Sequence, residues 1–148
     1  HLVLGTLHTT SAVKTIDRMV DALPAEEREQ TKSFLSQSLL AVITQLLVKS
    51  HDGRGRRAIC EIMIMTKAIG KLILTDQTHQ LASQLQMGKD FGMQMFDQAL
   101  LAAVQAREID PDDAFSYATE KRLLQKFVTD TTVLSRSMAV PAPPAPAS

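Results

Sequence analysis

The chain has 148 residues, of which 45% are apolar, and its 16 basic and 16 acidic side chains give a formal net charge of zero. This size fits one modest domain with a hydrophobic core, and the charge balance argues against a dedicated nucleic-acid binder. A single cysteine, Cys60, excludes an internal disulfide and a multi-cysteine zinc site, and the longest mostly apolar run, residues 39–48, is too short to span a membrane.

The chain opens on an apolar stretch, residues 1–7, with β character and little alternation. Such a run is typical of a strand that is buried on both faces in the parallel sheet of an α/β protein. We therefore expect a buried strand over residues 1–8, which would expose unpaired backbone and apolar faces if its neighbours were missing. Because the chain starts without methionine and directly in this strand, we expect it to be part of a longer protein.

Two helices are predicted next. Residues 9–11, Thr-Thr-Ser, supply N-cap candidates for a helix that begins near Val13 and ends at Pro24. Residues 25–27, Ala-Glu-Glu, open a second helix with acids in its first turn, where the helix dipole favours them. This helix is expected to end between residues 36 and 38.

A β-hairpin is predicted over residues 41–49 and 57–65, with the turn dipeptide Asp52-Gly53 between the strands. The turn region is basic. Nucleic-acid contact is one interpretation, but the zero net charge and the scarcity of aromatic residues favour a solvated turn or a subunit contact. The basic residues are Lys49, His51, Arg54, Arg56 and Arg57.

The second half is predicted to be helical. Apolar stripes follow Thr66, a break falls at residues 88–92, and Phe96 begins a strongly amphipathic helix. Asp110-Pro111 marks a further helix start. The pattern fades from about Thr129, and the Pro/Ala-rich residues 141–148 are expected to be extended and disordered.

The chain carries no phosphate-binding Gly-rich motif, no dinucleotide fingerprint and no metal-binding histidine spacing. His8 stands at the carboxyl end of the predicted strand, where ligands bind in open α/β sheets and where an imidazole can contact a phosphate or relay a proton. Considered alone, it fits a surface or capping histidine better.

Several blocks, in order, resemble one family. His-Leu-Val-Leu-Gly-Thr-Leu-His-Thr at residues 1–9 is similar to the histidine box of the secretion-type hexameric ATPases, most closely that of the type IV pilus retraction (twitching motility, PilT-like) ATPases. Ala-Ile-Gly-Lys-Leu-Ile at residues 68–73 resembles their Ala-Ile-Arg-Asn-Leu-Ile retraction motif, and Gly-Met-Gln at residues 92–94 resembles a helix start of the family. The four-cysteine insertion that type II secretion ATPases usually carry after the hairpin's first strand is missing, which favours the pilus branch.

This resemblance implies a fold and a set of site residues. The fold would be α/β: the C-terminal part of a RecA-like P-loop ATPase core over residues 1–65, then a helical subdomain over residues 66–128 and a disordered tail over residues 129–148. His8 would be the histidine-box residue near the γ-phosphate. His1, Thr6 and Thr9 would lie in the vicinity of the nucleotide.

The retraction motif implies a helix that couples nucleotide state to pilus disassembly. Its apolar face would consist of Ala68, Ile69, Leu72 and Ile73. Gly70 and Lys71 depart from the family's Arg-Asn pair, which puts normal coupling in doubt. A helix-interior glycine costs about 1 kcal/mol relative to alanine, and Gly70 is open to the alternative interpretation that it permits closer packing.

The implied parent is a homohexameric, cytoplasmic motor at the inner-membrane base of the pilus, which binds ATP and Mg²⁺, contacts the pilus platform protein and retracts pili. It has no transmembrane segment and binds no nucleic acid. The Walker A, Walker B and aspartate boxes are not in this sequence, so we expect the chain alone neither to bind ATP tightly nor to hydrolyse it. The alternatives are a non-catalytic helical interaction module and part of a type II secretion or pilus assembly ATPase.

Overall fold

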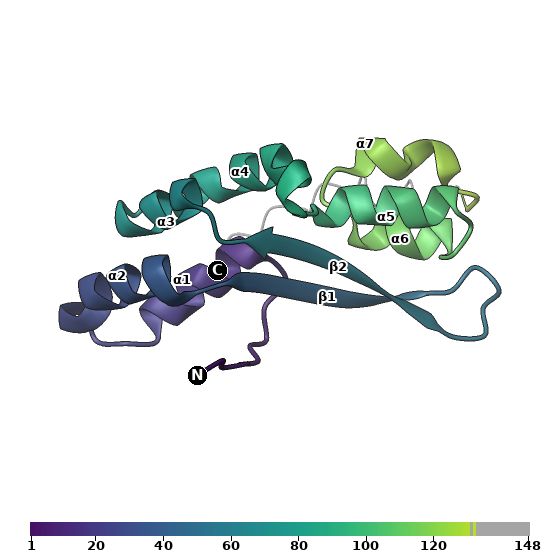
Figure 1. Cartoon of the computed structure of the whole chain (residues 1–148). Coiled ribbons are helices and arrows are strands. Elements are labelled where there is room, and N and C mark those ends of the chain that lie inside the picture. The colour runs from purple at the N-terminus through teal and green to yellow at the C-terminus, as the bar shows by residue number, and fades with distance from the viewer. Residues whose placement is uncertain (131, 133–148) are drawn as a thin grey trace, which may run out of the picture. The chain divides into compact units, whose positions relative to one another are not determined.

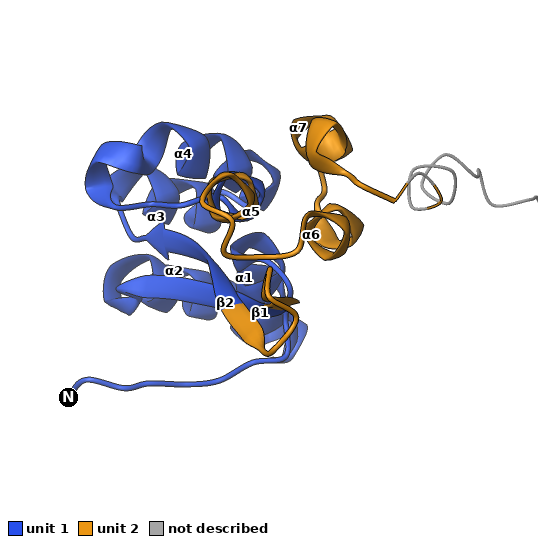
Figure 2. Ribbon diagram, turned by 90° about the vertical axis from the view of Figure 1, so that its right-hand side faces the viewer, with its two compact units in different colours: residues 1–47, 58–99 blue, residues 48–57, 100–148 orange. Residues whose placement is uncertain are grey.

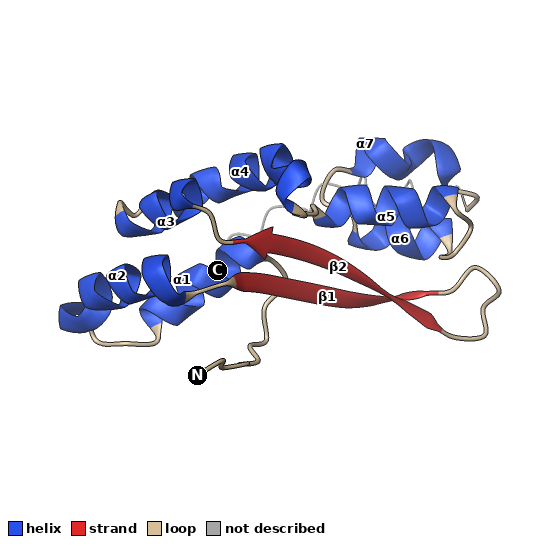
Figure 3. Cartoon of the chain, viewed as in Figure 1, coloured by secondary structure: helices blue, strands red, loops and turns tan. Residues whose placement is uncertain are grey.

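The computed structural model describes residues 1–130 and 132, and these form a mixed α/β structure (Figures 1 and 3). The predicted disordered tail, residues 129–148, lies outside the described residues except for 129, 130 and 132. Short 3₁₀ turns connect several of the helices. In chain order the helices and strands are α1 (Ala12–Asp21), α2 (Arg28–Ser38), β1 (Ala41–Lys49), β2 (Arg56–Ile64), α3 (Lys67–Leu74), α4 (Leu81–Met87), α5 (Phe96–Gln105), α6 (Pro111–Tyr117) and α7 (Lys121–Leu124).

The helix starts follow from local capping. The Ser11 hydroxyl accepts a hydrogen bond from the Lys14 amide at the start of α1, and the Thr66 hydroxyl accepts one from the Ile69 amide at the start of α3. Asp110 caps α6, with a proline at the first helical position. Each of these starts lies where the sequence predicts it, because capping depends on residues adjacent in the chain.

The hairpin is confirmed to within one residue at each strand end. The Ser50 amide donates to the carbonyl of Gly55, and the Met65 amide donates to the carbonyl of Leu40, both at 2.9 Å. In this antiparallel register Thr44 faces Glu61 across the two strands. Gly53 has a φ of +70° in the turn, a backbone conformation that favours glycine.

The chain divides into two compact units, which Figure 2 colours blue and orange. The first unit comprises residues 1–47 and 58–99. Its core joins one face of the hairpin to α1, α2, α3 and α4, so the retraction-type helix α3 packs in the same unit as the segment that follows the histidine box. The buried core residues are Ala12, Ile16, Val20, Leu35, Val42, Met63, Ile69, Ile73, Leu81, Leu85 and Met93.

The second unit comprises residues 48–57 and 100–148. Within it, Leu100, Ile109 and Leu124 are almost completely buried. The hairpin end is tied to the segment before α6, because the His51 amide donates to the Glu108 carbonyl and the Asp110 amide donates to the Lys49 carbonyl. None of the described helices is both long enough and apolar enough to cross a bilayer.

The predicted buried strand over residues 1–8 is wrong for this structure. Residues 1–9 have no regular secondary structure, and Leu2, Val3 and Leu4 are 76%, 82% and 90% exposed. A buried parallel strand needs a hydrogen-bonded neighbour on each edge, whereas the only sheet among the described residues is the two-stranded β1–β2 hairpin. The expected consequence of missing neighbours, exposed backbone and apolar side chains, is what the structure shows.

Candidate functional site

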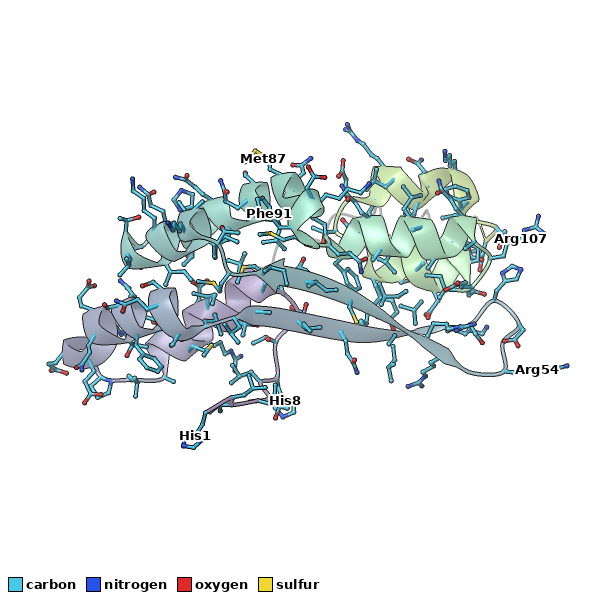
Figure 4. The ribbon with its side chains drawn as sticks, viewed as in Figure 1. His1, His8, Arg54, Met87, Phe91 and Arg107 are labelled. Carbon is cyan, nitrogen blue, oxygen red and sulfur yellow. The ribbon has the colours of Figure 1, made fainter. Side chains whose placement is uncertain are left out.

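The histidine-box segment lies at the surface of the first unit. His1, Thr6 and His8 are exposed, and Figure 4 shows both histidines on the irregular stretch that leads into α1. No hydrogen bond to the His8 imidazole is found among the described residues. The segment therefore brings His1, Thr6 and His8 together only as chain neighbours.

Thr9 is where this segment becomes anchored. Its hydroxyl is 2.6 Å from the hydroxyl of Thr15, which also donates to the carbonyl of Ser11 at 2.9 Å. One residue further, the Ala12 amide donates to a carboxylate oxygen of Glu61 at 2.8 Å. A carboxylate at a helix N-terminus satisfies an amide that lacks an intrahelical partner and interacts favourably with the helix dipole. Glu61 on β2 thus fixes the start of α1, directly after the histidine box.

Sequence reasoning missed this role of Glu61. A signal was available, because Glu61 is an acid in the middle of the apolar strand sequence Ile-Cys-Glu-Ile-Met. A carboxylate in such a half-buried position needs a hydrogen-bond partner.

The retraction-type helix α3 presents its apolar face to the core, with one correction. Ile69 and Ile73 are buried and Leu72 is half-buried, as expected. Ala68, predicted on the same face, is exposed. The reason is helical geometry: the buried stripe follows residues 69, 70 and 73, and Ala68, one residue before Ile69, lies about 100° around the helix from it.

Gly70 marks a close approach of α3 to α2. A Cβ atom placed on Gly70 would lie 3.0 Å from the backbone carbonyl oxygen of Ser36 and 3.6 Å from its Cβ. Gly70 is itself buried. The structure therefore supports the closer-packing interpretation of this glycine, since any larger side chain would meet the backbone of α2.

A second contact that sequence reasoning missed fixes the end of α3. The Lys32 ammonium lies 3.0 Å from a carboxylate oxygen of Asp76 and 3.1 Å from one of Glu29, and only 10% of the Lys32 side chain is exposed. Hydrogen bonds to Asp76 and then to Glu29 raise the pKa of Lys32 above its ordinary value, although burial opposes the shift. Asp76 has a φ of +59°, a left-handed conformation that aspartate tolerates better than most residues. Lys32 therefore ties the C-terminal end of α3 to α2.

A pocket of about 240 Å³ opens beside this ion pair, within the first unit. Val20 and Ile73 form apolar parts of its lining. Its other lining residues are Asp17, Asp21, Lys32, Asp76 and Thr78. No group of three or more histidine, cysteine or acidic side chains among the described residues is arranged to hold a metal ion.

Comparison with known proteins identifies the family. Residues 1–115 match the family described as type II/IV secretion system protein. The chain belongs to this family. It is 51% identical over 114 residues to a twitching motility protein from Neisseria gonorrhoeae, and 51% identical over 114 residues to the type IV pilus retractation ATPase PilT from Pseudomonas aeruginosa. These matches cover 77% of this chain but 30% and 33% of the two relatives.

A solved structure supports the same family. The structure described as the pilus retraction motor PilT with bound ADP matches 85% of this chain and 35% of its own, with a TM-score of 0.72 and 34% sequence identity. The fold of the chain is therefore that of part of a RecA-like secretion ATPase. The chain spans about a third of the length of the relatives it matches.

The sequence has no Gly-rich phosphate loop. His8, the residue predicted to lie near the phosphate, is exposed. Backbone amides and a lysine or metal ion supply most of the phosphate contacts in such enzymes.

Proposed function

We propose that this chain is part of a type IV pilus retraction motor, an ATPase that drives twitching motility. The observation that carries the proposal is the 51% identity over 114 residues to a twitching motility protein and to a pilus retractation ATPase. The intact motor works as a homohexamer with ATP and Mg²⁺. It is cytoplasmic and peripheral to the inner membrane, where it acts on the pilus platform protein.

Within that motor, His8 is the histidine-box residue near the γ-phosphate, and His1, Thr6 and Thr9 lie in the vicinity of the nucleotide. The exposure of Leu2, Val3 and Leu4 supports this role, because contiguous exposed apolar side chains mark surfaces that other parts of a protein cover. In the intact motor residues 1–8 form the buried strand that the sequence predicts. Glu61 and Thr9 then hold the last residues of that strand in register with α1.

Helix α3 is the element that transmits nucleotide state to the pilus, through Ile69, Leu72 and Ile73, with Ala68 at its exposed edge. We propose two domains for this part of the motor: the core over residues 1–65 and the helical part over residues 66–128. Two contacts support a rigid transmission from α2 to α3. They are the close approach at Gly70 and the Lys32–Asp76 ion pair.

The experiment is a chimera. The matching 114-residue segment of Pseudomonas aeruginosa PilT is replaced by that of this chain, and twitching motility is measured in a strain lacking its own PilT. We expect motility to be restored, and to be lost again with His8→Ala. His79→Ala, which removes another exposed histidine, is the matched control and should leave motility intact. A chimera that assembles and hydrolyses ATP but does not support retraction would refute the proposal.

A second measurement concerns the chain alone. A phosphate-release assay with ATP and Mg²⁺ should show no turnover above the buffer rate. Clear turnover would contradict the assignment, because no described residue could supply the phosphate contacts that hydrolysis needs.

A further inference from the structure

The end of the β-hairpin carries a concentrated positive charge that the proposed motor role does not use. Arg54, Arg56 and Arg57, which we call the arginine tip, fall within four positions, and residues 51–58 are all exposed. No carboxylate of a described residue forms an ion pair with any of the three guanidinium groups. Figure 4 shows Arg54 pointing away from the loop. Like charges held this close repel one another, so binding a partner of opposite charge would reduce the electrostatic repulsion among the three arginines.

The one acid in the loop is committed to the turn itself. Asp52 accepts hydrogen bonds from the Ser50 hydroxyl at 2.6 Å and from the Arg54 amide at 3.1 Å. The Ser50 hydrogen bond, followed by the Arg54 amide, lowers the pKa of Asp52. Its carboxylate is therefore ionised at neutral pH and shapes the loop, and it attracts Arg57 without forming an ion pair with it. All three arginines remain exposed.

The base of the loop is held by hydrogen bonds and one ion pair. The Lys49 amide donates to the Asp113 carboxylate at 2.8 Å, and the Lys49 ammonium lies 3.9 Å from Asp110. Together with the backbone bonds of His51 and Lys49 described above, these contacts fix the loop to the helices of the second unit. The arginine tip thus projects from a fixed base, with its three side chains available together.

The composition of the tip selects the kind of partner. Residues 49–57 are all polar, charged or glycine, and no phenylalanine, tyrosine or tryptophan lies between Phe34 and Phe91. Protein interfaces depend on buried aromatic or aliphatic anchors, and single-stranded nucleic acids are held by aromatic stacking. A lipid headgroup layer requires neither, because it attracts clustered basic side chains through its diffuse negative potential.

We propose that the arginine tip binds the surface of a bilayer that contains anionic phospholipids. Each cationic side chain near such a surface strengthens partitioning by about fivefold, so the three arginines together supply about 100-fold. The attraction falls with ionic strength, because the Debye length is about 8 Å at physiological salt. This inference does not depend on ATP hydrolysis or on pilus retraction.

The test is flotation of the full chain with vesicles of phosphatidylcholine alone and of phosphatidylcholine with about 30 mol% phosphatidylglycerol. We expect partitioning onto the anionic vesicles about 100-fold above that onto the neutral ones, and a decrease with added salt. The triple variant Arg54→Gln, Arg56→Gln, Arg57→Gln should lose this preference. Circular dichroism establishes that each variant is folded.

The matched control removes the same charge elsewhere, in the triple variant Lys67→Gln, Lys89→Gln, Arg122→Gln, whose three side chains are exposed. It should retain the preference for anionic vesicles. Equal loss in the control would overturn the proposal, because it would show a response to net charge alone. Absence of binding by the wild-type chain would overturn it too. So would tip-dependent binding to duplex DNA without binding to vesicles, which would assign the tip to nucleic acid.

Discussion

The ion pair between Lys32 and Asp76 should stabilise the first unit measurably, and a double-mutant cycle can isolate its contribution. Lys32→Met keeps the aliphatic stem and removes the charge. Asp76→Asn keeps a side chain that tolerates the φ of +59° at this position. The two single variants and the double variant therefore change the charge while disturbing packing and backbone little.

The magnitude follows from the geometry. At the observed 3.0 Å, Coulomb's law gives about 1.4 kcal/mol in water and about 5.5 kcal/mol at an effective dielectric constant of about 20. The Asp76 side chain is 76% exposed, so solvent screens the pair strongly, whereas the Lys32 side chain is 10% exposed and is already desolvated. We expect a coupling free energy of about 1 kcal/mol, after side-chain ordering is subtracted.

Urea unfolding monitored by circular dichroism measures this coupling, since the chain has no tryptophan. The reference cycle uses Arg28→Met and Asp21→Asn, a pair 3.6 Å apart with side chains 44% and 66% exposed, and should give less than about 0.5 kcal/mol. Because the pKa of Lys32 is raised, the contribution of its charge to the free energy of unfolding is complete at neutral pH. This contribution is lost only as the pH rises above the ordinary lysine pKa of about 10.4. A Lys32–Asp76 coupling no larger than the reference would refute the reasoning that burial of one partner strengthens this pair.

Three further predictions concern stability. Glu61→Ala should lower the free energy of unfolding by about 1–2 kcal/mol, because it leaves the first amide of α1 without its acceptor. Hydrogen exchange should show that the start of α1 opens first in this variant. Unchanged exchange at the start of α1 would contradict the anchoring role of Glu61. Arg107→Gly should raise the melting temperature, by the equivalent of about 0.5–1 kcal/mol, because Arg107 has a φ of +56° after α5, and Arg107→Ala should give no such gain. For Asp112, burial opposes ionisation, but hydrogen bonds from the Thr129 hydroxyl and from the Asp130 and Thr129 amides outweigh it and lower the pKa. Its stabilising contribution should therefore be complete above about pH 4 and be lost as the pH falls below the ordinary aspartate value of about 3.9, and Asp112→Asn should remove that pH dependence.

The local elements were predictable because their signals lie within a few residues of one another. Asp52-Gly53 and the flanking β-type runs placed the hairpin to within one residue, and Asp110-Pro111 placed the start of α6. The family was also predictable, since ordered motifs at fixed spacing are far more specific than any one of them. The exposure of Ala68 and the conformation of residues 1–8 were not predictable from the sequence. The exposure of Ala68 depends on which neighbours α3 packs against, and residues 1–8 need neighbouring strands to pair with before they can form a strand.

Outside residues 1–8, the sequence alone therefore determined which segments become helices and strands, where they are capped, and the family to which the chain belongs, because capping, turn and periodicity signals act between near neighbours in the chain. Only the tertiary structure decided that Glu61 holds the start of α1, that Lys32 holds the end of α3 and that Gly70 lies against the backbone of α2. These contacts join residues 34–49 positions apart. Which such residues meet depends on how the elements pack, since packing brings together groups that no local pattern links.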